Sequence, residues 1–175
     1  MDLNSFILYD PTSSNPLHIP TGAGNYIVIF RVGRGLPDTG LPVQMAKFRG
    51  MDILYTGVAG PSSGLRRRII WGHFGNNAGR STLRLSLGVL FGFTPIPRDA
   101  GKPFNGHTRF CPDEEARLTA WMKDNLLVYY FPNDDYEEME NELIATLNPP
   151  STSRRTLIQS TVRFVRTFLN SGQTG

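Results

Sequence analysis

Three short runs of β-branched and aromatic residues decide the class of fold open to this chain. They are "NYIVIFRV" from Asn25, "DILYTGV" from Asp52 and "NLLVYYFP" from Asn125. Side chains of this kind pack well on a pleated surface and therefore favour extended strands. Segments with helical signals separate the second run from the third and follow the third. This order predicts an α+β domain with a small, three-stranded, mostly antiparallel sheet flanked by helices.

Five segments carry the helical signals. "LRRRIIWGHF" follows a glycine-rich turn, and Ser81 is placed to cap a helix that runs to about Phe91. "PDEEARLTAWMKD" begins with a proline and acidic residues, as helix starts do. Asn133 or Asp134 is expected to cap "DYEEMENELIATL". "SRRTLIQSTVRFVRTFLN" has the apolar spacing of an amphipathic C-terminal helix.

The totals indicate one domain. The chain has 175 residues, of which 39% are hydrophobic, enough for one compact core. We expect an irregular arm over residues 1–23, a domain over 24–152 and a C-terminal helix over 153–175 that packs on the same domain. Residues 94–110 are expected to form a long loop. The single cysteine, Cys111, excludes an intrachain disulfide and a cysteine-rich zinc site.

The sequence lacks the features of a targeting or membrane segment. Its N-terminus has neither a basic start nor a long apolar run, so it does not resemble a secretory signal. No stretch reaches the roughly 20 apolar residues that span a bilayer. We therefore expect an intracellular, cytoplasmic protein without a membrane partner.

The charges are unevenly distributed. The formal net charge is only +3, but the segment from Leu65 to Leu85 contains no acidic residue. It holds five arginines: Arg66, Arg67, Arg68, Arg80 and Arg84. Acidic residues concentrate at 113–115 and 134–142. A basic surface facing a local acidic site is typical of a protein that binds a phosphate-bearing polymer. A solvated arginine face is the alternative.

Glu140 is oddly placed for a carboxylate. Read as a helix, its segment gathers five apolar residues on one side: Tyr136, Met139, Leu143, Ile144 and Leu147. Glu140 falls inside this stripe, whereas Glu137, Glu138 and Glu142 project away from it. A carboxylate on a buried face is costly unless a cation or hydrogen-bond donors meet it. The pattern therefore predicts either a metal ligand or a buried ion pair with an arginine.

Several of these segments together resemble a known family. "GNY" at Gly24–Tyr26 and "YTG" at Tyr55–Gly57 are followed by "LRRRI" and, later, by "ENELIATLNPP". Both tripeptides, in this order, are similar to those of the GIY-YIG nucleases, which include homing endonucleases, some restriction enzymes and part of a repair excinuclease. "GHFGNNAGRSTLRLSLG" and "ARLTAWMKDNL" resemble small stand-alone members of that family.

The resemblance implies a reaction and a set of roles. It implies hydrolysis of DNA phosphodiester bonds that leaves a 5′-phosphate and a 3′-hydroxyl. Glu140 is expected to hold Mg²⁺ or Mn²⁺, and Arg68 to stabilise charge on the phosphoryl group. Tyr26 and Tyr55 are expected to organise the attacking water, and the sequence leaves open which of them is the base. His73 assists catalysis or has a structural role.

The arginines are assigned by their helical positions. Arg68 lies beside Leu65 on the helix wheel and is our choice for the inward, catalytic arginine, with Arg66 as its rival. Arg67 points away from the apolar residues. We expect four residues to contact DNA: Arg67, Arg80, Ser81 and Arg84.

The sequence departs from the family pattern at four positions. Asn25 and Thr56 occupy the middle of the two tripeptides, and Val58 stands where many members have a lysine. Thr152 stands where an asparagine is usual. Two other functions stay open. One is a non-catalytic module that binds DNA or a protein, and the other is a structural adaptor in which Glu140 is only ion-paired.

Overall fold

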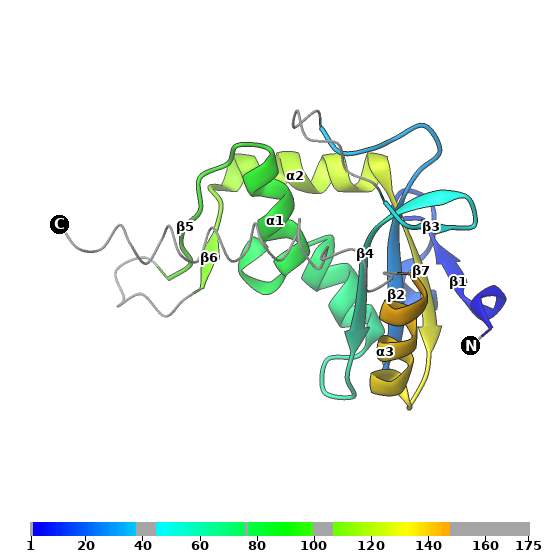
Figure 1. Ribbon diagram of the computed structural model, residues 1–175. Coiled ribbons are helices and arrows are strands. Elements are labelled where there is room, and N and C mark those ends of the chain that lie inside the picture. Colours follow the sequence, from blue (N-terminus) through cyan, green and yellow to red (C-terminus); the bar gives the residue numbers. More distant parts are fainter. Residues whose placement is uncertain (1, 38–44, 76, 100–106, 148–175) are drawn as a thin grey trace.

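An antiparallel sheet of five strands, in the order β1-β7-β2-β4-β3, forms the centre of the fold (Figure 1). The computed structural model describes residues 2–37, 45–75, 77–99 and 107–147. The three predicted strands are the long ones: β2 (Gly24–Phe30), β4 (Met51–Ala59) and β7 (Leu126–Pro132). Each pairs antiparallel with its neighbours. The α+β class is confirmed.

The prediction of three strands was wrong, because two short strands extend the sheet. They are β1 (Ile7–Tyr9), paired with β7, and β3 (Lys47–Phe48), paired with β4. β1 belongs to the segment expected to be an irregular arm. That arm also places Phe6, Tyr9 and Ile19 in the core, so it is part of the domain. Burial of these three side chains holds a segment whose own strand signal is weak.

Two of the α-helices begin where their sequence signals predict, and a third begins later than expected. α1 (Thr82–Leu90) starts after Ser81, whose Oγ accepts a hydrogen bond from the backbone N–H of Arg84. α2 (Pro112–Asn125) starts with Pro112 and three acidic residues, and α3 (Tyr136–Leu147) follows β7. α3 begins after Asp135 and not after the expected caps Asn133 or Asp134. The arginine-rich helix differs from expectation. It is a π-helix (Arg67–His73) that ends with a bond from the N–H of Phe74 to the carbonyl of Ile69.

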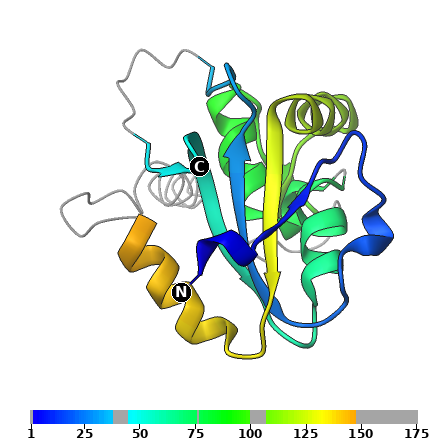
Figure 2. The same cartoon turned by 90° about the vertical axis from the view of Figure 1, so that its right-hand side faces the viewer.

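The two faces of the sheet carry different helices. Tyr26 and Val28 of β2 pack with Ile69 of the π-helix and with apolar residues of α1 and α2. Ile27 and Ile29 project to the other face and pack with apolar residues of α3. Figures 1 and 2 show the π-helix, α1 and α2 on one side of the strands and α3 on the other. We call these the first face and the second face.

The remaining predictions concern the loop and the C-terminus. Residues 94–110 are not simply a loop, since β5 (Ile96–Pro97) and β6 (Thr108–Arg109) pair as a two-stranded antiparallel sheet. The predicted helix over 153–175 and Thr152 lie outside the described residues. Among the described helices, none has the length and apolar character that crossing a bilayer requires.

Candidate functional site

Tyr26 and Tyr55 lie side by side on the first face. In the antiparallel register, Tyr26 is opposite Gly57 and Val28 is opposite Tyr55. Because Tyr26 and Val28 project to the same face of their strand, so do the two tyrosines. Their ring centroids are 6.2 Å apart and their planes differ by 28°. Tyr26 is fully buried, whereas Tyr55 is half-buried.

The glycines of both tripeptides are required by close packing. A Cβ on Gly57 would lie 2.4 Å from Tyr26 Oη and 2.7 Å from a ring carbon of Tyr55. A Cβ on Gly24 would lie 2.3 Å from the carbonyl oxygen of Phe131 on the neighbouring strand. Neither position has room for a side chain. The tripeptides are therefore where the tyrosines and the strands approach most closely.

His73 connects Tyr26 to the start of α1. Tyr26 Oη lies 2.6 Å from His73 Nε2, and His73 Nδ1 lies 2.7 Å from Ser81 Oγ. Both rings of the pair are buried, and the His73 ring also lies edge-on to Tyr55 at 5.6 Å between centroids. The π-helix thus brings its last residue back onto the two tyrosines.

Arg68 is the arginine that reaches this cluster. Its Nε–H donates to Tyr26 Oη at 3.3 Å, and its Nη1 donates to the carbonyl of Arg80 at 3.2 Å. Arg67 is exposed. Arg66, the rival candidate, instead donates to two backbone carbonyls of the N-terminal arm. Its guanidinium is therefore used to hold the arm.

The electrostatics fix the direction of these hydrogen bonds. Burial raises the pKa of Tyr26, and the neighbouring Tyr55 raises it further, so the phenol keeps its proton. Burial, together with the cations Arg68 and Arg84, lowers the pKa of His73 to about 3. His73 is then neutral near pH 7. Tyr26 donates to Nε2, and Nδ1–H donates to the hydroxyl oxygen of Ser81.

Two residues expected to contact DNA are buried instead. Arg84 has no exposed surface, and its guanidinium donates to the His73 carbonyl and to Glu115 Oε2. Ser81 is 3% exposed and caps α1 while it accepts from His73. The prediction that Arg84 and Ser81 contact DNA was wrong. A charged group inside the fold is stabilised by its pairing, which Glu115 provides.

Sequence reasoning missed Glu115. Besides Arg84, its carboxylate accepts from the backbone N–H groups of Ala78 (2.7 Å) and Phe110 (3.1 Å). It therefore holds the turn at 78–80, which carries Arg80 to the cluster. A signal was present: on the helix wheel of α1, Arg84 lies only about 20° from Phe91 and about 60° from Leu87, so it belongs to the apolar side of its helix, as Glu140 does in α3.

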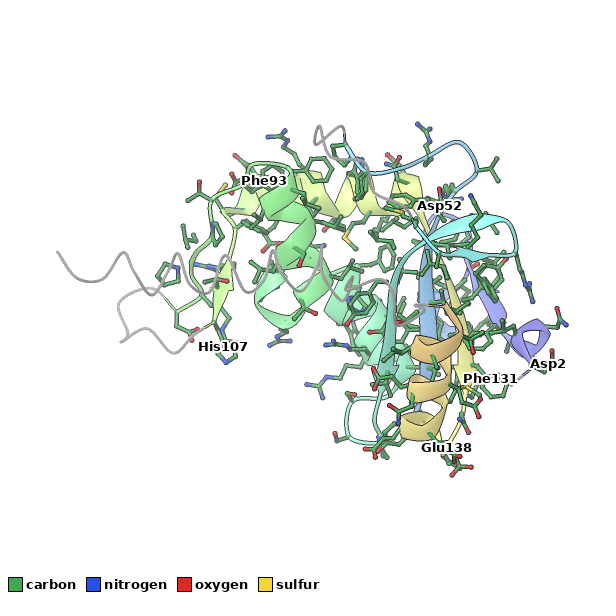
Figure 3. All side chains as sticks on the ribbon, viewed as in Figure 1. Asp2, Asp52, Phe93, His107, Phe131 and Glu138 are labelled. Carbon is green, nitrogen blue, oxygen red and sulfur yellow. The ribbon has the colours of Figure 1, made fainter. Side chains whose placement is uncertain are left out.

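Glu140 lies on the second face and is not joined to the tyrosine cluster. Its helix packs through Leu143 and Leu147 against Ile27 and Ile29, which project away from Tyr26. Glu140 is half-buried, and no residue of the described part forms a hydrogen bond or ion pair with it. The alternative of a Glu140–arginine pair is therefore not formed within those ranges. Figure 3 shows Glu138, near the start of α3, directed outward.

Asn25 explains one departure from the family pattern. It is fully buried on the second face, next to Tyr26 in the chain, and its Nδ2 donates to the carbonyl of Tyr136 at 2.8 Å. This bond ties the first residue of α3 to the strand that carries Tyr26. Among the described residues, no group of three or more His, Cys, Asp and Glu side chains is arranged to hold a metal ion.

Residues 24–161 of the chain match the family model of the GIY-YIG catalytic domain. The search of curated proteins found no significant match, and neither did the search of solved structures. The match begins at the strand that carries Tyr26 and includes the π-helix and α3. It covers most of the chain, and we conclude that this protein belongs to the GIY-YIG catalytic-domain family, a family of nucleases.

Proposed function

We propose that the protein is a metal-dependent DNA endonuclease that leaves a 5′-phosphate and a 3′-hydroxyl. The hydrogen-bonded chain from Arg68 through Tyr26 to His73 supports this proposal, because it lies within the residues that match the nuclease family. Arg67 and Arg80 are exposed beside it and supply positive charge for neighbouring phosphates. Phosphodiester hydrolysis needs an activated water and a cation for phosphoryl charge.

Arg68 supplies the fixed cation. The water oxygen attacks phosphorus, the bond from phosphorus to O3′ breaks, and O3′ takes up a proton as it leaves. The hydrogen bonds of Arg68 to Tyr26 and to the Arg80 carbonyl leave further N–H groups of the same guanidinium for phosphate oxygens. A guanidinium stays charged and can bind two oxygens at once. Charge that grows on the phosphoryl oxygens is therefore stabilised in the transition state.

The two tyrosines and His73 can carry the proton of the water. Tyr26 is enclosed, whereas its neighbour Tyr55 is half-buried and can meet the water. His73 Nε2 already accepts the Tyr26 proton, so Tyr26 Oη can accept a proton that arrives through Tyr55 as its own passes to His73. The charge of Arg68 is one cause of the low pKa of His73. Binding of an anionic phosphate to Arg68 offsets that charge. The proton affinity of His73 therefore increases when substrate is bound.

Glu140 is the residue that fits the metal. Its carboxylate is partly exposed and unpaired within the described ranges, which leaves oxygen ligands for a cation that keeps several waters, as Mg²⁺ does. Mn²⁺ accepts the same donors. Its helix packs on β2 and β4, the strands that carry the two tyrosines. A cation held by Glu140 would supply positive charge for a DNA phosphate on the α3 side of the sheet.

Plasmid cleavage tests the proposal. The parental protein should nick supercoiled DNA with Mg²⁺ and not with chelator. Arg68→Ala should lower the rate by roughly 10²- to 10³-fold with little effect on binding, because its charge matters most in the transition state. Arg67→Ala should lower the rate far less. Equal losses in both variants, with folding intact, would refute the role of Arg68. Binding without cleavage would identify a DNA-binding module instead.

A further inference from the structure

Among the residues that the structure describes, Trp71 is the one exposed aromatic residue. Its side chain is 61% exposed, and every other Phe, Tyr and Trp in the described ranges is buried or half-buried. Burying a side chain as large as an indole strongly stabilises a folded protein. The other described aromatic residues contribute such burial, and Trp71 does not. The exposed ring is therefore available to a ligand.

Two arginines, Arg67 and Arg68, lie close to Trp71 along the same π-helix. Arg67 lies four residues earlier on the same π-helix, so the two exposed side chains share one side of it. Arg68 Cδ lies 3.6 Å from the position of a Cβ on Gly72, the residue that follows Trp71. The Arg68 side chain thus passes beside the backbone that follows Trp71 on its way to Tyr26. The exposed indole and the proposed phosphate-binding arginine therefore project from neighbouring positions of the same helix.

The turn at 78–80 adds a further cation to this side of the site. Arg68 Nη1 donates to the backbone carbonyl of Arg80, which brings that turn against the π-helix. The Arg80 side chain is exposed. Exposed Arg67 and Arg80 therefore accompany the exposed ring, and no acidic residue lies between Leu65 and Leu85. This charge complements a phosphate-bearing chain and excludes a basic partner.

We infer that Trp71 is a stacking platform for an unpaired nucleobase next to the phosphate held by Arg68. The inference rests on the proposed function and specifies its substrate class. Both faces of a base inside a duplex are covered by its neighbours, so only an unstacked base can lie on an indole. The substrate is therefore DNA with a single-stranded or unpaired segment at the cut, such as a flap or a branch. Arg67 and Arg80 contact the phosphates on either side.

Tryptophan fluorescence tests the stacking directly. The second tryptophan, Trp121, packs edge-on against Phe30 and Phe91 at 6.4 Å and 4.9 Å between centroids. In a Trp121→Phe variant of the full chain, Trp71 is the only indole. In chelator, oligothymidylate and a flapped duplex should quench its emission, whereas a blunt duplex of equal length should not. The difference between the parental and Trp71→Phe spectra gives the same readout without the Trp121 substitution.

Binding affinity supplies the second measurement. Trp71→Ala should weaken binding of oligothymidylate by about tenfold or more, the effect of one lost base stack. Trp71→Phe should recover most of it. Val32→Ala removes a side chain that is 86% exposed and should change nothing. Blunt-duplex binding should be similar in all four proteins.

The outcomes separate this inference from the nuclease assignment. One outcome would overturn the stacking platform alone: the parental protein nicks DNA, but Trp71→Ala binds oligothymidylate with the same affinity as Val32→Ala. Unchanged Trp71 emission at saturation would overturn it as well. Emission typical of a buried indole in the free protein would mean that a segment of the chain or a second copy covers the ring. A parental protein that binds no form of DNA would overturn both.

Discussion

The phenol of Tyr26 donates its proton to Nε2 of His73 across 2.6 Å, and both side chains are fully enclosed by the fold. In so dry an environment the bond is stronger than it would be in water, and losing either partner leaves a buried polar group unsatisfied. A buried neutral histidine also makes stability depend on pH, since the unfolded chain can protonate it.

The first prediction concerns that pH dependence. The pKa of His73 is about 3 in the folded protein, against an ordinary value of 6.5. Between these pH values the unfolded chain binds more protons than the folded protein. The stability that neutral His73 contributes is therefore fully present above pH 6.5 and is lost as the pH drops towards 3. The loss between pH 7 and pH 5 should be about 2 kcal/mol. Urea unfolding at both pH values should show a smaller loss for His73→Gln. His18→Gln, at an exposed site, should behave like the parent.

The second prediction separates a buried arginine from an exposed one. Arg84→Ala leaves Glu115 buried without its cation and should cost about 3–5 kcal/mol in the free energy of unfolding. Arg80→Ala should change that free energy by less than about 0.5 kcal/mol. It should instead reduce the salt dependence of DNA binding by about one released ion. Equal stability of the two variants in urea would show that the Arg84–Glu115 pair does not hold the fold.

The third prediction concerns the glycine between the tyrosines. Gly57→Ala places a methyl group 2.4 Å from Tyr26 Oη, so the Tyr26 ring or the strand must shift. We expect a loss of about 1–3 kcal/mol in stability and a larger loss of cleavage. Gly72→Ala is the matched control, because its nearest side-chain contact would be an ordinary 3.6 Å. Thermal melts and nicking assays should rank the two variants in this order. A fully active Gly57→Ala protein would contradict the close packing described.

The fourth prediction concerns Glu140. Glu140→Gln keeps the volume of the side chain and removes its charge. Since no described residue pairs with Glu140, stability without metal should change by less than about 0.5 kcal/mol. Metal-dependent cleavage should be abolished. The matched control is Glu138→Gln, at an exposed position two residues earlier. A folded Glu140→Gln protein that cuts at the parental rate would remove Glu140 from the site.

The long strands could be predicted from sequence and the short ones could not. Seven or more residues with β-branched and aromatic side chains identify β2, β4 and β7 locally. β1 and β3 have three and two residues, and each exists because a longer strand offers it a pairing edge. The irregular composition around Ile7 hides such a strand. Its partner is β7, more than a hundred residues away.

The site could be predicted only where the signal is local in the sequence. Helical position alone separates Arg68 from Arg67, because one lies beside Leu65 and the other does not. The partners of Arg84 depend on α1 and α2 lying together, which no local pattern states. Arg84 was therefore predicted from its charge alone to lie at the surface, although its position on the apolar side of α1 indicated burial.

Five positions separate Arg68 from His73, yet both side chains reach one oxygen atom, Tyr26 Oη. In an α-helix, residues five apart point about 140° away from each other, so one of the two would miss it. Bonds from each N–H to the carbonyl five residues earlier widen the helix and bring residues five apart much closer together around its axis. The bond from Phe74 to Ile69 is of this kind. An ordinary α-helix over the same residues would keep the arginine, the histidine and the tyrosine in the chain and still separate the charge from the proton acceptor.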